Sequence, residues 1–97
     1  MKGATIDSLS RRIHEAAAVL RESGAREVYL FGSAATGRAA SATDIDLAVS
    51  GLPPARFFRA MSKAAVAIGR PIDLIDLDED TPFTRYLRSE GELRRVG

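Results

Sequence analysis

One segment in the middle of the chain alternates strictly between two kinds of side chain, and this alternation constrains the fold most. In an extended strand, Ile45, Leu47 and Val49 point to one face, whereas Asp44, Asp46 and Ala48 point to the other. A strand with one apolar face is stable only when that face packs against another layer. The alternation therefore predicts a half-buried strand in a sheet that has helices packed against it.

The rest of the chain supplies two further strand-like runs and three helical segments. The runs Glu27–Phe31 and Ile72–Leu77 are rich in β-branched and other apolar residues, as strands are. Apolar residues at three- and four-residue spacing predict helices over residues 5–23 and 53–68. Thr81-Pro82 predicts the start of a short third helix, since threonine caps helices and proline fits their first position. The predicted order is α-β-β-α-β-α.

Length and composition restrict the chain to one small domain. Ninety-seven residues form a single domain, residues 1–97, of the α/β (α+β) class with a small mixed sheet. Fourteen Lys and Arg against thirteen Asp and Glu give a formal net charge of +1, so the overall charge gives no indication of direct nucleic-acid or membrane binding. The absence of cysteine excludes disulfides, thiolate zinc sites and thiol nucleophiles.

No apolar stretch approaches the ~18–20 residues of a transmembrane helix, and the first residues do not resemble a signal peptide. We therefore expect a soluble, cytoplasmic protein. Whether the chain forms a homo-oligomer is left open by the sequence.

The pair Asp44-x-Asp46 is the most informative candidate for chemistry. Residues two apart on a strand share a face, with Cα atoms ~6.5–7 Å apart, so the two carboxylates can converge on one point. Two neighbouring anions repel and need a compensating charge, for which Mg²⁺ is the usual partner of oxygen ligands. The alternative is that both side chains lie on a solvated strand face, and the pair alone leaves both interpretations open.

Two other features could complete such a site. Gly32-Ser33 directly follows a strand-like run, where glycine lets the backbone approach an anion and the turn can present N–H groups and a hydroxyl to phosphate. A plain strand-ending turn is the alternative. Asp73 lies in an apolar run and must face solvent or a site, because an unpaired buried carboxylate is costly. If its strand lies beside residues 44–50, Asp73 joins Asp44 and Asp46 in a cluster of three carboxylates.

Together these residues resemble a known family. Gly32-Ser33, ten intervening residues and then Asp44-Ile45-Asp46 resemble the signature of the DNA polymerase β-type nucleotidyltransferase superfamily. The segments 31–33, 43–49 and 70–75 are most similar to its minimal nucleotidyltransferase (MNT) branch. The resemblance extends over residues 28–77 and implies a nucleotidyltransferase fold.

The resemblance also implies an activity and the residues that carry it. The expected reaction is Mg²⁺-dependent transfer of AMP from ATP to an acceptor hydroxyl, with pyrophosphate leaving. Asp44, Asp46 and Asp73 would be the catalytic carboxylates and the ligands of two Mg²⁺ ions. The Gly32-Ser33 turn would bind the phosphates of the nucleoside triphosphate.

A protein partner is implied as well. Members of this branch are often encoded beside an all-helical HEPN-type toxin and act as its antitoxin, in some cases by transferring AMP to a tyrosine of the toxin. The small size of the chain agrees with such a partner. Ninety-seven residues are enough for the part of a transferase that binds metal and triphosphate, but leave almost nothing to build an acceptor pocket.

The sequence departs from the family pattern just after the glycine-serine pair. Many members have arginines there, whereas this chain has Ala34 and Thr36. The triphosphate must then be held from elsewhere. Arg38 within the turn and Lys63 on the predicted second helix are the candidates, with Arg70 as a further one.

Two other functions compete with this prediction. The chain could be a catalytically silent binding module that keeps the fold and neutralises a helical partner by occlusion. It could also be an aminoglycoside-type nucleotidyltransferase, although that activity normally needs an added substrate domain. Three acids at these positions favour the enzyme over the silent module, since occlusion does not require them.

Overall fold

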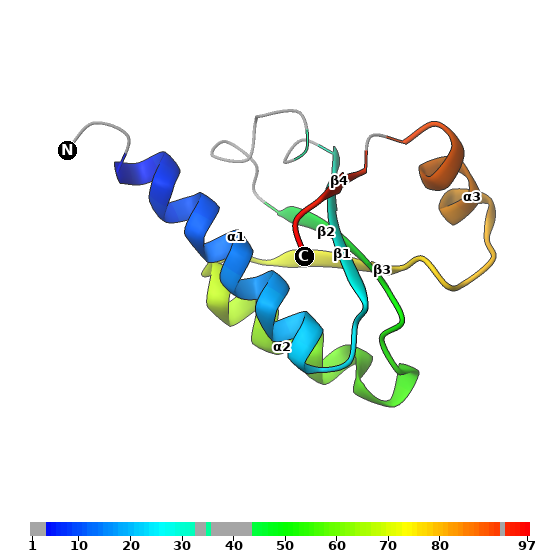
Figure 1. Cartoon of the computed structure of the whole chain (residues 1–97), viewed down its shortest axis with the longest axis horizontal. Coiled ribbons are helices and arrows are strands. Elements are labelled where there is room, and N and C mark those ends of the chain that lie inside the picture. The colour runs from blue at the N-terminus through cyan, green and yellow to red at the C-terminus, as the bar shows by residue number, and fades with distance from the viewer. Residues whose placement is uncertain (1–3, 33–34, 36–43, 92) are drawn as a thin grey trace.

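The structure, a computed structural model, describes residues 4–32, 35, 44–91 and 93–97. The elements follow one another as α1 (Ala4–Glu22), β1 (Glu27–Phe31), β2 (Ile45–Ser50), the 3₁₀ turn η3 (Pro54–Arg56), α2 (Phe57–Ile68), β3 (Ile72–Asp76), α3 (Pro82–Ser89) and β4 (Arg94–Arg95) (Figure 1). The predicted α-β-β-α-β-α order is confirmed. A two-residue edge strand, β4, follows the last helix.

The four strands form one mixed sheet in the order β3-β2-β1-β4. β1 pairs antiparallel with β2 and with β4, whereas β2 and β3 run parallel. A parallel pair needs a crossover connection, and α2 provides it between β2 and β3. This crossover places Asp73 of β3 directly opposite Asp46 of β2.

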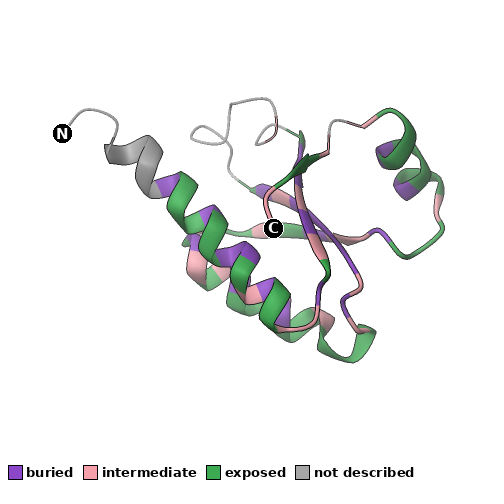
Figure 2. Cartoon of the chain, viewed as in Figure 1, coloured by how far each residue is buried: buried purple, intermediate pink, exposed green. Residues whose placement is uncertain are grey.

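α1 and α2 pack against each other and cover one face of the sheet (Figure 1). The largest side chains that are almost completely buried lie in this layer: Leu20, Val28, Ile45, Leu47, Val49 and Ile68. Figure 2 shows this buried zone along the central strands and on the inner sides of the two helices. The apolar face predicted for residues 44–50 is therefore the face that these helices cover. Asp46 consequently points to the other side.

α3 lies over that other side of the sheet (Figure 1). Its Leu87 packs in a second, smaller cluster with Phe31, Ala48 and Leu77. The helix begins as predicted, with Pro82 at its first position and Thr81 as the N-cap. Leu87 of α3 therefore packs on the face of the sheet on which Asp46 lies.

No helix within the described ranges is both long enough and apolar enough to cross a membrane.

Candidate active site

Asp46 and Asp73 lie side by side on the same face of the sheet. Each is the second residue of its strand, and the two are direct partners in the parallel register of β2 and β3. Asp46 is half-buried and Asp73 is exposed. Burial raises the pKa of Asp46, and the charge of Asp73, a hydrogen bond shared with Asp73 and the charge of Asp44 raise it further. This pair is therefore an anionic site that favours a bound proton or cation.

Asp44 lies immediately before β2 and is exposed. Its charge acts on Asp46, which agrees with the predicted convergence of the two side chains. However, the described part of the chain contains no group of three or more His, Cys, Asp or Glu side chains arranged to hold a metal ion. The predicted cluster of three carboxylates is therefore not formed among the described residues: Asp46 and Asp73 are a close pair, and Asp44 acts on Asp46 by charge.

The donor set at this point fits Mg²⁺. Carboxylate oxygens are the ligands that this ion prefers. The pKa of Asp46 is raised first by burial and then by the charges of Asp73 and Asp44, and a divalent cation would offset those charges. Asp44, Asp46 and Asp73 are the residues that could hold it.

Gly32 lies at the end of β1, beside Asp46. Its φ of +67° belongs to the left-handed region that favours glycine, and its carbonyl accepts a hydrogen bond from the N–H of Ala35 at 3.1 Å. A Cβ at this position would collide with Oδ2 of Asp46. The close approach of the Gly32 backbone to the Asp46 carboxylate therefore requires a residue without a side chain at position 32.

Only some of the other predicted phosphate-binding residues can be placed relative to this pair. Ser33 and Arg38 lie outside the described residues. Lys63 is exposed on α2, and α2 covers the face of the sheet opposite Asp46. The helical periodicity placed Lys63 on α2, but the face on which α2 packs depends on the crossover. The geometry gives no support to phosphate binding by Lys63. Arg70, by contrast, lies just before β3, at the same end of the strand as Asp73.

Two aromatic residues beside the carboxylates were not recognised from the sequence as part of a site. Phe31 is the direct partner of Asp46 across the antiparallel pair of β1 and β2. Phe83 of α3 packs edge-on against Phe31, with ring centroids 6.0 Å apart and an interplanar angle of 65°. The only sequence signal for Phe83 is its place directly after Thr81-Pro82, at the second position of a capped helix.

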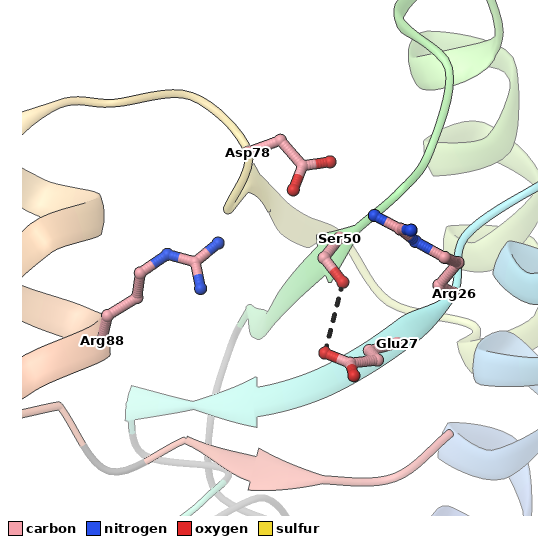
Figure 3. Close-up of a pocket in the computed structure, with 5 residues that line it drawn as sticks. All are labelled: Arg26, Glu27, Ser50, Asp78 and Arg88. Carbon is pink, nitrogen blue, oxygen red and sulfur yellow. Dashed lines mark hydrogen bonds between the residues drawn. The ribbon is translucent and has the colours of Figure 1, made fainter.

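A cavity of about 350 Å³ lies at the opposite end of the same strands and is lined by Arg26, Glu27, Ser50, Asp78 and Arg88. Figure 3 shows Arg26 and Arg88 on opposite sides of it. Both acids take part in internal hydrogen bonds: Asp78 accepts from the N–H of Gly51, and Glu27 accepts from the hydroxyls of Ser50 and Tyr29. None of the predicted site residues lines this cavity, so the candidate active site is the carboxylate pair.

The comparison with protein families decides what kind of domain this is. The sequence model of the family described as "Polymerase beta, Nucleotidyltransferase" matches residues 15–93, which include β1, β2, β3 and the carboxylate pair. The chain belongs to the polymerase beta nucleotidyltransferase family. The resemblance drawn from Gly32-Ser33 and Asp44-x-Asp46 is thus confirmed at the level of the family, and the fold is the nucleotidyltransferase fold.

Several solved structures share this nucleotidyltransferase fold. A toxin–antitoxin complex with AMP-PNP aligns with a TM-score of 0.67 and 23% identity over 91% of this chain and 72% of that chain. A tri-AMPylated Shewanella oneidensis HEPN toxin in complex with MNT antitoxin aligns with a TM-score of 0.66 and 21% identity, over 92% and 71% of the two chains. The toxin–antitoxin MntA–HepT aligns with a TM-score of 0.64 and 20% identity, over 90% and 70%. No curated protein matches this nucleotidyltransferase.

Proposed function

We propose that this chain is a Mg²⁺-dependent nucleotidyltransferase that transfers AMP from ATP to a hydroxyl of a partner protein. The acceptor would be a tyrosine of a HEPN-type toxin, so that the chain acts as the antitoxin. The observation that carries the proposal is the direct register of Asp46 and Asp73, with the Gly32 backbone against Asp46. Neighbouring carboxylates could hold the metal ions that stabilise an in-line displacement at phosphorus, and Gly32 begins the turn proposed to bind the phosphates.

In this proposal the carboxylates hold the metal and receive the proton. Asp44, Asp46 and Asp73 would hold Mg²⁺, which neutralises charge on the α-phosphate and on the leaving pyrophosphate when it is bound. The acceptor oxygen forms a bond to the α-phosphorus, and the bond from that phosphorus to the pyrophosphate oxygen breaks. Asp73, the more exposed of the pair, is the candidate to accept the proton of the acceptor hydroxyl.

The order of the strands suggests where each substrate binds. Gly32 ends β1 on one side of Asp46, and Asp73 lies on β3 on the other side. The triphosphate would therefore lie over the β1 side and the acceptor hydroxyl would approach over β3. An acceptor on a separate protein agrees with this arrangement, because the β3 side is an edge of the sheet.

The partner is proposed from the solved structures that share the fold. These are complexes of toxins with antitoxins, one with AMP-PNP and one with an AMPylated HEPN toxin. The first description agrees with nucleotide binding by such a complex, and the second agrees with AMP transfer to a HEPN toxin.

Intact-mass spectrometry of the HEPN-type partner tests the proposal. After incubation with this chain, ATP and Mg²⁺, the partner should gain mass in whole AMP units. The gain should be lost with Asp44→Asn/Asp46→Asn and retained with the matched control Asp80→Asn. Asp80 is an exposed aspartate that pairs with Arg85 at 2.6 Å, outside the site.

The second candidate is the silent binding module. It is favoured by Ala34 and Thr36, which stand where many proteins of the resembling branch have arginines, so a weaker grip on the triphosphate is expected. Inhibition of the partner without any mass gain, retained in the Asp44→Asn/Asp46→Asn variant, would establish this function and refute the transferase.

A further inference from the structure

Phe83 presents an exposed aromatic ring beside the carboxylate pair. Of its surface, 46% is exposed, although the ring packs on Phe31, which is buried. Phe31 and Asp46 are direct partners in an antiparallel pair, so their side chains lie on the same face of the sheet. The two phenylalanines thus form an apolar wall on the β1 side of the site, with the buried ring supporting the exposed one.

The position of Phe83 is held by a network of hydrogen bonds at the start of α3. The Thr84 N–H donates to the Thr81 hydroxyl at 3.1 Å, and the Thr81 N–H donates to the Thr84 hydroxyl at 3.0 Å, which is a complete capping box. The Thr84 hydroxyl also donates to the carbonyl of Glu79 at 2.6 Å, and Thr84 is only 3% exposed. The first turn of α3 is therefore anchored on both sides of Phe83, and the ring is preorganised.

The base is the part of a nucleotide that can stack on such an aromatic wall. The phosphates and sugar are polar, whereas the base is a flat ring that stacks on aromatic side chains. Phe31 lies on β1, the strand that leads into the turn proposed to bind phosphate, and Asp73 lies on the other side of Asp46. The base of the nucleotide, rather than the acceptor, therefore lies within reach of Phe83.

We propose that Phe83, supported by Phe31, stacks on the base of the bound nucleoside triphosphate and contributes to its affinity. This inference rests on the proposed function, since it assumes that the carboxylate pair takes a nucleotide. The first turn of α3 would then bind substrate in addition to packing on the sheet. A purine, with its larger ring, should stack better than a pyrimidine.

The absence of tryptophan from the chain allows a direct test. Phe83→Trp introduces a single tryptophan, whose fluorescence ATP should quench in the presence of Mg²⁺. Inorganic tripolyphosphate has no base and should not quench it. Phe58→Trp is the matched control, because Phe58 is an exposed aromatic (73%) on α2, the helix that covers the other face. Its fluorescence should respond to neither ligand.

Affinity measurements complete the test. Phe83→Ala should weaken ATP binding about 5- to 100-fold, the range that base stacking on an aromatic residue provides, and should leave tripolyphosphate binding unchanged. Phe83→Tyr should retain ATP affinity. Equal ATP affinity of wild type and Phe83→Ala, or equal weakening of ATP and tripolyphosphate, would overturn the inference while the proposed function stands. If wild type binds neither ligand, the proposed function fails and the inference fails with it.

Discussion

Asp46 and Asp73 are direct partners across the parallel strands β2 and β3, although 27 positions separate them in the sequence. Burial raises the pKa of Asp46, and repulsion by the neighbouring carboxylate of Asp73 raises it further. The pair therefore costs stability at neutral pH unless a cation or proton offsets the charge, and this gives the site a measurable effect on folding.

We expect Asp46→Asn to stabilise the metal-free protein at neutral pH. An aspartate whose pKa is raised by folding contributes stability at low pH, and this contribution is lost as the pH rises through the raised pKa. The variant should therefore melt a few degrees above wild type at pH 7, since about 1 kcal/mol corresponds to roughly 4–8 °C for a domain of this size. The difference should shrink as the pH falls towards the ordinary pKa of aspartate. Thermal melts from pH 4 to 8 measure it.

Mg²⁺ should reverse this difference. It should raise the melting temperature of wild type, because it binds the folded site, and raise that of Asp46→Asn less. Asp80→Asn, outside the site, should respond to Mg²⁺ as wild type does. A difference between wild type and Asp46→Asn that is independent of pH and of Mg²⁺ would contradict the coupling of Asp46 to Asp73.

Gly32→Ala should destabilise the domain and abolish AMP transfer. Alanine at position 32 would have to adopt a positive φ, and its Cβ would collide with Oδ2 of Asp46. Gly69→Ala is the matched control, because Gly69 also has a positive φ, +78°, but a Cβ there would meet only the Arg12 guanidinium at 3.6 Å. Urea denaturation should show a loss of about 1 kcal/mol for Gly69→Ala and a larger loss for Gly32→Ala. Equal losses, with AMP transfer retained in both, would refute a special role of Gly32.

Thr81→Ala should lower the free energy of unfolding by about 1 kcal/mol, because it removes the hydroxyl that accepts the N–H of Thr84 in the capping box. If α3 holds Phe83 against the nucleotide, the same variant should also weaken ATP binding. Thr81→Ser keeps the hydroxyl and should behave as wild type in both measurements. A variant that loses stability without any loss of ATP affinity would separate the cap from the placement of Phe83.

Leu47→Ala should remove about 2–5 kcal/mol of stability, since Leu47 is 0% exposed between the sheet and the helices α1 and α2. Val66→Ala is the control: Val66 is 81% exposed on α2 and its truncation should change stability by less than about 0.5 kcal/mol. Chemical denaturation of the two variants and wild type measures both effects. Similar losses for the two would contradict the assignment of the core face of β2.

The alternation of residues 44–50 correctly predicted that Ile45, Leu47 and Val49 face the core, because side chains on a strand point alternately to its two faces. The prediction of a half-buried strand was wrong beyond Asp46, since Ala48 and Ser50 on the opposite face are buried as well and Ala48 packs with Leu87 of α3. The same local reasoning predicted the capped start of α3, which is confirmed, and placed Asp44 and Asp46 on one face as candidate site residues. These predictions depend only on neighbours within a few residues, so the amino-acid sequence alone contains them.

Only the tertiary structure decided which residues meet. The crossover through α2 put Asp73 opposite Asp46, and it put Lys63 on the far face of the sheet. The packing of α3 on the sheet brought Phe83 to Phe31 and so to the edge of the site. Helical and strand periodicities predict on which face of its own helix or strand a residue lies. They do not give the neighbour that covers that face, because contacts between distant segments depend on strand order, crossover and packing.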